Sequence, residues 1–227
     1  NGGLTLGASS VQVPSSAPAL RVAASSGGQW YEGNTTLVME TQACGSTAPP
    51  CVLVTNAALG FVNQPRPLPG NGAVFVNAGN ATVSGTLDGQ LTIGTSNDLR
   101  LGGNLVYADN PQSNPNSNDV CGLLAEGNVV VTTTAPSNLT IQASVVALNT
   151  SFSVENWWVG PPKGTLSIYG GLIQKNRGAV GTFNGVTGQK VSGYSKDYRY
   201  DTRLSSLAPP FSPTTGDYQM VMWQENR

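Results

Sequence analysis

The stretch AVFVNAGNATVSGTLDGQLTIGTSNDLRLGGNLVYA, residues 73–108, decides the fold. It is a series of short apolar runs, each expected to be a strand, separated by a few residues of Gly, Asn, Asp and Ser: 73–77, 81–87, 89–94, 97–102 and 103–108. The same pattern continues from 123 to 183. Strands this short, with so little chain between them, leave no room for crossover helices. A chain that keeps moving in one direction must then wind as a coil of parallel strands. The sequence therefore predicts a parallel β-solenoid of roughly five rungs.

The flanking sequence divides the chain into three predicted parts. The proline-rich break NQPRPLPGNG (63–72) separates an N-terminal β region, 1–70, from the solenoid, 71–187. From Gly188 onward the sequence becomes rich in Tyr, Lys and Arg, so 188–227 is predicted to be a C-terminal capping segment. The ends of a parallel coil expose unpaired backbone groups that need such caps. The expected fold class is all-β: a parallel β-solenoid capped by a smaller β-sandwich-like or irregular β region.

Three local predictions accompany this division. No segment repeats apolar residues at helical spacing over three turns, so no strong helix is expected, although YDTRLSSL (200–207) suits one or two helical turns. DYQMVMWQ (217–224) alternates like a final strand. The loop ADNPQSNPNSNDV (108–120) lacks apolar residues between its ends and is expected to be solvated and mobile.

Two of the three cysteines are predicted to pair. Cys44 and Cys51 flank the tight loop GSTAPP between two strand-like segments, 35–42 and 51–56, which suggests a hairpin closed by a disulfide. Such a bond favours a location outside the reducing cytosol. The alternative is two free thiols. Cys121 precedes an apolar strand and is expected to be a small buried core residue.

The chain has no histidine, which excludes Ser-His-Asp and Cys-His catalysis, zinc sites of the HExxH type and any histidine base. No phosphate-binding P-loop sequence occurs. We therefore expect a protein that is not an enzyme and has no cofactor and no metal. Two alternatives stay open: a glycosidase or lyase using Asp98 and Glu126 on neighbouring rungs, and calcium held by the Asp and Asn residues at turns.

Charge is unevenly distributed, although the whole chain carries a net charge of only −1. Between Lys163 and Arg203 lie seven basic residues against two acidic ones, Asp197 and Asp201, with tyrosines interleaved. Basic groups follow phosphates and aromatic faces stack on bases. The alternative is a solvated face whose charges pair with one another. The candidate DNA- or ligand-binding residues are Lys163, Lys175, Arg177, Lys190, Tyr194, Lys196, Tyr198, Arg199 and Arg203.

Two segments carry a resemblance to a known family. They are GTLDGQLTIGTSNDLRLGGNLVYAD with GLLAEGNVVV, and LSIYGGLIQKNRGAVGTFNG with GYSKDYRYDTRLSSLAPPFSPTTGDYQMVMWQ. Over roughly residues 72–227 the chain resembles the extracellular part of the competence-associated, ComZ-like minor pilins of the Deinococcus–Thermus bacteria. The run from Tyr194 to Trp223 is the more specific part. That family's N-terminal pilin helix and processing motif do not occur in these 227 residues.

The resemblance implies a non-enzymatic cell-surface protein at or near the tip of a type IV pilus. Its expected partners are DNA, caught during natural transformation, and other pilin subunits. The sequence has no stretch of 18 apolar residues, so no membrane contact by this chain itself is expected. The alternatives are a carbohydrate-active β-solenoid such as a phage tailspike or polysaccharide lyase, and a purely structural adhesin or pilus subunit that makes its contact through loop 108–120.

Overall fold

The structure, a computed structural model, describes residues 16–42, 44 and 48–213. The predicted strand at 217–224 lies outside the described residues. Within them, fifteen strands join in one mixed sheet, whose main path runs β1-β5-β7-β9-β11-β8-β6-β2-β3-β4. The all-β prediction is confirmed, and no helix in this part of the chain is long and apolar enough to cross a membrane.

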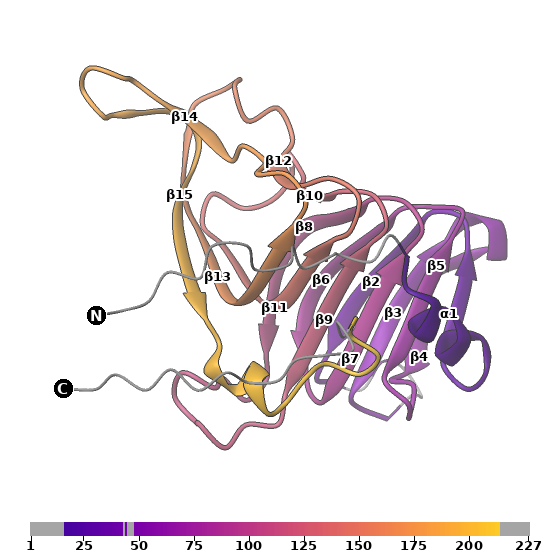
Figure 1. Cartoon of the computed structure of the whole chain (residues 1–227). Helices are drawn as coiled ribbons and strands as arrows, with labels where there is room; N and C mark the ends of the chain where they lie inside the picture. The colour runs from indigo at the N-terminus through magenta and orange to yellow at the C-terminus, as the bar shows by residue number, and fades with distance from the viewer. Residues whose placement is uncertain (1–15, 43, 45–47, 214–227) are drawn as a thin grey trace, which may run out of the picture.

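Two parallel ladders make up most of the sheet (Figure 1). The first consists of β1 (Gln29–Glu32), β5 (Ala73–Asn77), β7 (Gln90–Thr95), β9 (Val120–Ala125), β11 (Leu139–Ala147), β13 (Pro162–Gln174) and β15 (Lys190–Tyr200). The second consists of β2 (Thr35–Glu40), β6 (Ala81–Leu87), β8 (Leu99–Tyr107), β10 (Val129–Val131) and β12 (Phe152–Val154).

The prediction of a β-solenoid is wrong. In a solenoid each ladder would form a separate sheet on one face of the coil, whereas here the two ladders belong to one sheet. β8 also pairs with β11 at Leu105 and Ile141, which joins the ladders into one sheet. That sheet curls strongly into a half-barrel. Antiparallel pairs add a further departure: β2 pairs with β3 (Cys51–Asn56), β3 with β4 (Phe61–Pro67), and β14 (Gly181–Phe183) with β15.

The concave side of the sheet encloses one apolar core. Its buried side chains come from both ladders and alternate along strands such as β2 and β10, whereas β9 is buried at all six positions. This alternation is what places one face of a strand in the core and the other in solvent. Cys121 is fully buried in this core, as expected, and burial raises the pKa of its thiol to about 12.

The structure contains one short helix that the sequence did not lead us to expect, α1 (Pro18–Ser25). Proline at its first turn favours this start, and Leu20, Ala23 and Ala24 are buried at helical spacing. These side chains pack against Phe75 on the outer side of the first ladder. Two short 3₁₀ segments, η1 (Ala57–Leu59) and η2 (Thr202–Ser205), complete the elements, and η2 confirms the helical turn expected within 200–207.

The turns between the ladders are held by a row of Asn and Asp side chains. The Oδ1 atom of Asn80 accepts a hydrogen bond from the Asp98 amide at 3.1 Å, and Asp98 Oδ1 accepts one from the Asn128 amide at 2.8 Å. Each side chain thereby satisfies a backbone N–H of the next strand pair, as turn Asn and Asp residues commonly do. The carboxylate of Asp98 is therefore part of the framework.

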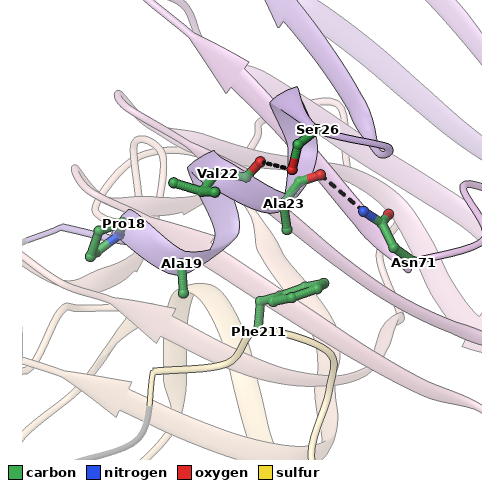
Figure 2. Close-up of a pocket in the computed structure, with 7 residues that line it drawn as sticks. All are labelled: Pro18, Ala19, Val22, Ala23, Ser26, Asn71 and Phe211. Carbon is green, nitrogen blue, oxygen red and sulfur yellow. Dashed lines mark hydrogen bonds between the residues drawn. The ribbon is translucent and has the colours of Figure 1, made fainter.

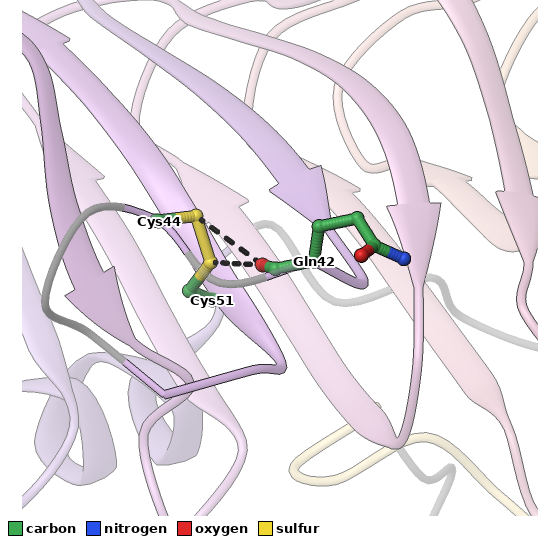
Figure 3. Close-up of a disulfide and its surroundings, with 3 residues drawn as sticks. All are labelled: Gln42, Cys44 and Cys51. Atoms are coloured by element: carbon green, nitrogen blue, oxygen red, sulfur yellow. Dashed lines mark hydrogen bonds between the residues drawn. A yellow bond between two sulfur atoms is a disulfide. The ribbon is translucent and has the colours of Figure 1, made fainter.

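The disulfide prediction is confirmed. Cys44 and Cys51 are bonded with their Cα atoms 6.3 Å apart, and the Gln42 carbonyl oxygen lies 3.2 Å from Cys51 Sγ (Figure 3). The segments on either side, β2 and β3, form the expected antiparallel hairpin. A bond over so short a separation stabilises the fold by about 2.5 kcal/mol on the chain-entropy account.

The loop 108–119 is exposed at most of its residues, as expected, but polar side chains anchor it at both ends. Asp119 is 1% exposed, and its carboxylate accepts hydrogen bonds from the amides of Gly89 and Asp109 at 2.7 and 2.9 Å. Ser117 donates to the Asp109 carbonyl at 2.6 Å. The expectation of a solvated loop therefore fails at the anchoring residues Ser117 and Asp119, whose side chains bond the backbone of the loop and of Gly89.

Candidate functional site

The last strand of the first ladder, β15, places two of the predicted binding residues at the end of the core. Lys196 is in register with Leu166 of β13, and Tyr198 is in register with Ile168. Leu166 and Ile168 are both core residues. Since in-register residues of a parallel ladder point to the same face, Lys196 and Tyr198 continue the core face beyond its last buried layer.

Around these two side chains the core opens into a hollow of about 300 Å³. Arg177, Lys196 and Tyr198 line it together with a smaller polar group, Gln174. Its remaining lining residues are apolar or glycine: Phe152, Leu172, Gly178 and Val180. The hollow therefore combines an apolar floor with two cations, and the Tyr198 ring stands edge-on to Phe152 with centroids 6.5 Å apart.

Partial burial shifts the pKa values of two side chains in the hollow, Lys196 and Tyr198. Lys196 Nζ lies 5.9 Å from the Tyr198 ring centroid, and the pKa of Lys196 is lowered by burial and by the nearby positive charge of Arg177. Burial raises the pKa of Tyr198 to about 12, with Arg177 acting in the opposite direction. The phenol of Tyr198 is thus protonated at neutral pH and available as a hydrogen-bond donor.

Three other predicted residues are used inside the fold. The Lys163 ammonium donates to the carbonyls of Thr133 and Ala135, at 3.1 and 2.7 Å, and to the Tyr194 hydroxyl at 3.1 Å. Tyr194 is fully buried. Lys190 donates to the Gly164 carbonyl at 3.0 Å and to the carbonyl of Lys163. These groups hold β13, β15 and the preceding loop together.

Arg203 also has a role within the fold. Its guanidinium pairs with the buried Asp201 carboxylate at 2.7 Å and donates to the carbonyls of Ser117 and Asp119 at 2.7 and 3.2 Å. It thereby ties η2 to the anchored loop. Its side chain is only 13% exposed.

The remaining two predicted residues are exposed. Arg199 pairs with Asp197 at 3.1 Å on the face of β15 opposite to Lys196 and Tyr198, which largely neutralises its charge. Lys175 follows the end of β13, two residues before Arg177. Among the described residues, neither Lys175 nor Arg177 takes part in an ion pair.

The structure thus brings together three of the nine predicted residues, Arg177, Lys196 and Tyr198, with Lys175 beside them. Composition could locate these side chains but missed the floor of the hollow, Phe152, Leu172 and Val180. These three residues come from β12, from β13 and from the segment before β14, so only the tertiary packing reveals that they meet.

The carboxylates considered for catalysis serve structural roles. Asp98 accepts from Asn128, as described above. Glu126 pairs with Arg21 at 2.6 Å and accepts from the Ala17 amide at 3.1 Å, which fixes α1 on the sheet. In the described part of the chain, no group of three or more Cys, Asp or Glu side chains is placed to hold a metal ion.

A larger hollow, of about 530 Å³, lies beside α1 (Figure 2). Val22, Ala23 and Phe211 give it an apolar lining, and its polar groups are Ser26 and Asn71. The Asn71 side chain donates to the Ala23 carbonyl at 2.9 Å, so it is occupied within the fold. No charged side chain lines this hollow.

No protein-family profile, no curated protein and no solved structure matches this chain.

Proposed function

We propose that this chain is a non-enzymatic cell-surface protein of the minor-pilin type, which binds DNA through the hollow at the end of its sheet. The observation that carries the proposal is the hollow that Arg177 lines together with Lys196 and Tyr198, the two side chains that the register of β13 and β15 turns to the core face. Two cations can contact successive phosphates, and an aromatic ring next to them offers a stacking surface.

Two further features support this assignment. Lys175 extends the basic rim along the exposed chain after β13. The Cys44–Cys51 disulfide fits an oxidising environment such as the cell surface. Incorporation into a pilus, with other pilin subunits as partners, is proposed on the sequence resemblance.

Binding of a short fluorescein-labelled duplex, followed by fluorescence anisotropy between about 50 and about 200 mM salt, tests the proposal. Arg177→Gln and Lys196→Gln should each weaken binding and reduce the slope of log K against log salt by about 1. Lys175→Gln should have a smaller effect because its side chain lies outside the hollow.

Arg66→Gln is the matched control. Arg66 lies on β4, and its guanidinium stands over the ring of Phe61 at 4.7 Å. Strand β4 is at the other end of the sheet from β15 (Figure 1). Removing Arg66 changes the net charge by the same amount but leaves the hollow intact. Equal losses in Arg66→Gln and Lys196→Gln would reject the site, and no binding by the unsubstituted protein would reject DNA as the ligand.

A further inference from the structure

A third hollow, which shares no lining residue with the other two, lies where the turn between β12 and β13 folds over the start of β13. Its volume is about 260 Å³. Val154, Trp157, Val159, Gly160, Pro161 and Gly193 give it an apolar lining, and Thr133, Glu155, Asn156 and Lys163 are its polar residues. The hydrogen-bonding state of these polar groups restricts the chemical class of ligand that the hollow can bind.

Glu155 is a fixed, ionised hydrogen-bond acceptor. Arg100 Nη2 donates to its two oxygens at 3.2 and 3.3 Å, and the Thr133 amide donates to Oε2 at 3.1 Å. These hydrogen bonds, that of Thr133 first, lower the pKa of Glu155. A carboxylate has about four acceptor positions, and this side chain remains 34% exposed, so it can accept further hydrogen bonds from a ligand.

Lys163 does not make the hollow a site for anions. An ammonium has three donors, and those of Lys163 all point to partners within the fold, the Thr133 and Ala135 carbonyls and the Tyr194 hydroxyl. A phosphate entering here would face the Glu155 carboxylate without a free cation to balance it. A cationic ligand would in turn face Arg100 and Lys163.

The wall of the hollow is aromatic and held in place. Trp157 is half-buried and packs against the core, and its carbonyl accepts from Ser192 Oγ at 2.6 Å. The ring of Trp158 stands edge-on to that of Trp157, with centroids 5.4 Å apart and planes at 81°. A tryptophan held in this way offers a rigid apolar surface at low entropic cost.

We propose that this hollow binds a neutral sugar residue of a cell-surface or environmental polysaccharide. A pyranose ring has an apolar C–H face, which suits Trp157, and a rim of hydroxyls. The hydroxyls donate to Glu155 and bond the exposed amide of Asn156. An apolar wall with a few fixed polar groups is the usual composition of a small-ligand site.

Isothermal titration calorimetry with four neutral oligosaccharides, cellohexaose, maltohexaose, chitohexaose and mannohexaose, tests this proposal. At least one should bind with a Kd of about 1 mM, as expected for a shallow site. Trp157→Ala and Glu155→Gln should each weaken that binding by about tenfold or more. Trp157→Phe, which keeps an aromatic wall, should retain part of the affinity.

Phe183→Ala is the control, because Phe183 is an aromatic residue that is 52% exposed and does not line the hollow. Its affinity should stay within about twofold of the unsubstituted protein. Far-UV circular dichroism should show that every variant is folded at the titration temperature, since Trp157→Ala and Glu155→Gln also remove contacts within the fold. The proposal is overturned if none of the four sugars binds, or if Trp157→Ala and Glu155→Gln bind as well as Phe183→Ala. DNA binding by Trp157→Ala should be unchanged. The proposed sugar site and the basic hollow, which is the hollow lined by Arg177, Lys196 and Tyr198, are therefore tested independently.

Discussion

At the scale of single residues, Tyr194 shows why a tyrosine between basic residues need not be a binding surface. Its sequence neighbours suggest an exposed ring for stacking, but β15 turns it into the core at 0% exposure. Its hydroxyl donates to the Pro136 carbonyl at 2.7 Å and accepts from Lys163. Burial raises the pKa of Tyr194 to about 12, from an ordinary value of 10.0.

This shift predicts a loss of stability at alkaline pH. Between pH 10 and pH 12 the phenol of Tyr194 is deprotonated in the unfolded chain and protonated in the folded protein. Folding then takes up a proton, so the free energy of unfolding falls as pH rises through this window. Tyr194 should contribute a slope of about 1.4 kcal/mol per pH unit, and its contribution should be fully present below pH 10.

Urea unfolding of the unsubstituted protein and of Tyr194→Phe at several pH values measures this slope. The difference in stability between the two proteins should stay constant from about pH 7 to about pH 9 and should shrink above about pH 10. Tyr31 and Tyr198, whose pKa values are also raised to about 12, should leave a residual slope in the variant. A constant difference up to about pH 11 would contradict the prediction.

At the scale of elements, one glycine allows β6 to lie between β2 and β8. Gly85 has φ +109°, and a Cβ placed there would lie 2.2 Å from the Met39 carbonyl oxygen of β2. The register between β6 and β8 shifts between Val83 and Gly85. The strand therefore bends at this position, and a side chain would force β2 and β6 apart.

Gly85→Ala should lower the free energy of unfolding by about 3 kcal/mol, since it combines backbone strain with a clash against fixed backbone. Chemical denaturation measures the loss. Gly70→Ala is the control, because Gly70 has no positive φ and a Cβ there meets no atom within 4 Å. Its stability should change by no more than about 0.5 kcal/mol. Similar losses in both variants would show that the bend at Gly85 is not the cause.

The sequence predicted two of the short strands with their observed bounds, but it divided longer strands. Runs 73–77 and 81–87 became β5 and β6 with the predicted bounds. Runs 97–102 and 103–108 were predicted as two strands but form the single strand β8, because Gly102 and Gly103 continue the extended chain instead of ending it. The helix α1 was missed because its eight residues are too few to show helical periodicity.

The basic hollow could be predicted only in part for a related reason. Local composition points to Arg177, Lys196 and Tyr198, since charge and aromatic content are visible along the chain. It cannot separate them from Lys163 and Arg203, because the difference lies in carbonyl groups supplied by loops far away in the sequence. The register between strands depends on how distant segments pack together, which local composition does not show.

At the scale of the whole molecule, one core extends across the boundaries that amino-acid composition suggests at residues 71 and 188. The buried cluster extends from Tyr31 in β1 to Tyr194 in β15. β1 pairs with β5, and β13 pairs with β15, so backbone hydrogen bonds also cross both boundaries. The three segments share one sheet and one apolar core, which couples their stabilities.

This coupling predicts that unfolding occurs in a single transition, although chains above about 150 residues often populate intermediates. In urea, loss of the sheet followed by far-UV circular dichroism should coincide with the change in tryptophan fluorescence, which reports on Trp30 near α1 and on Trp157 near β13. Non-coincident curves would mean that one end of the sheet opens by itself. Since β15 has only β13 and β14 as neighbours among the described strands, that end, which carries both proposed sites, would be the part that opens first.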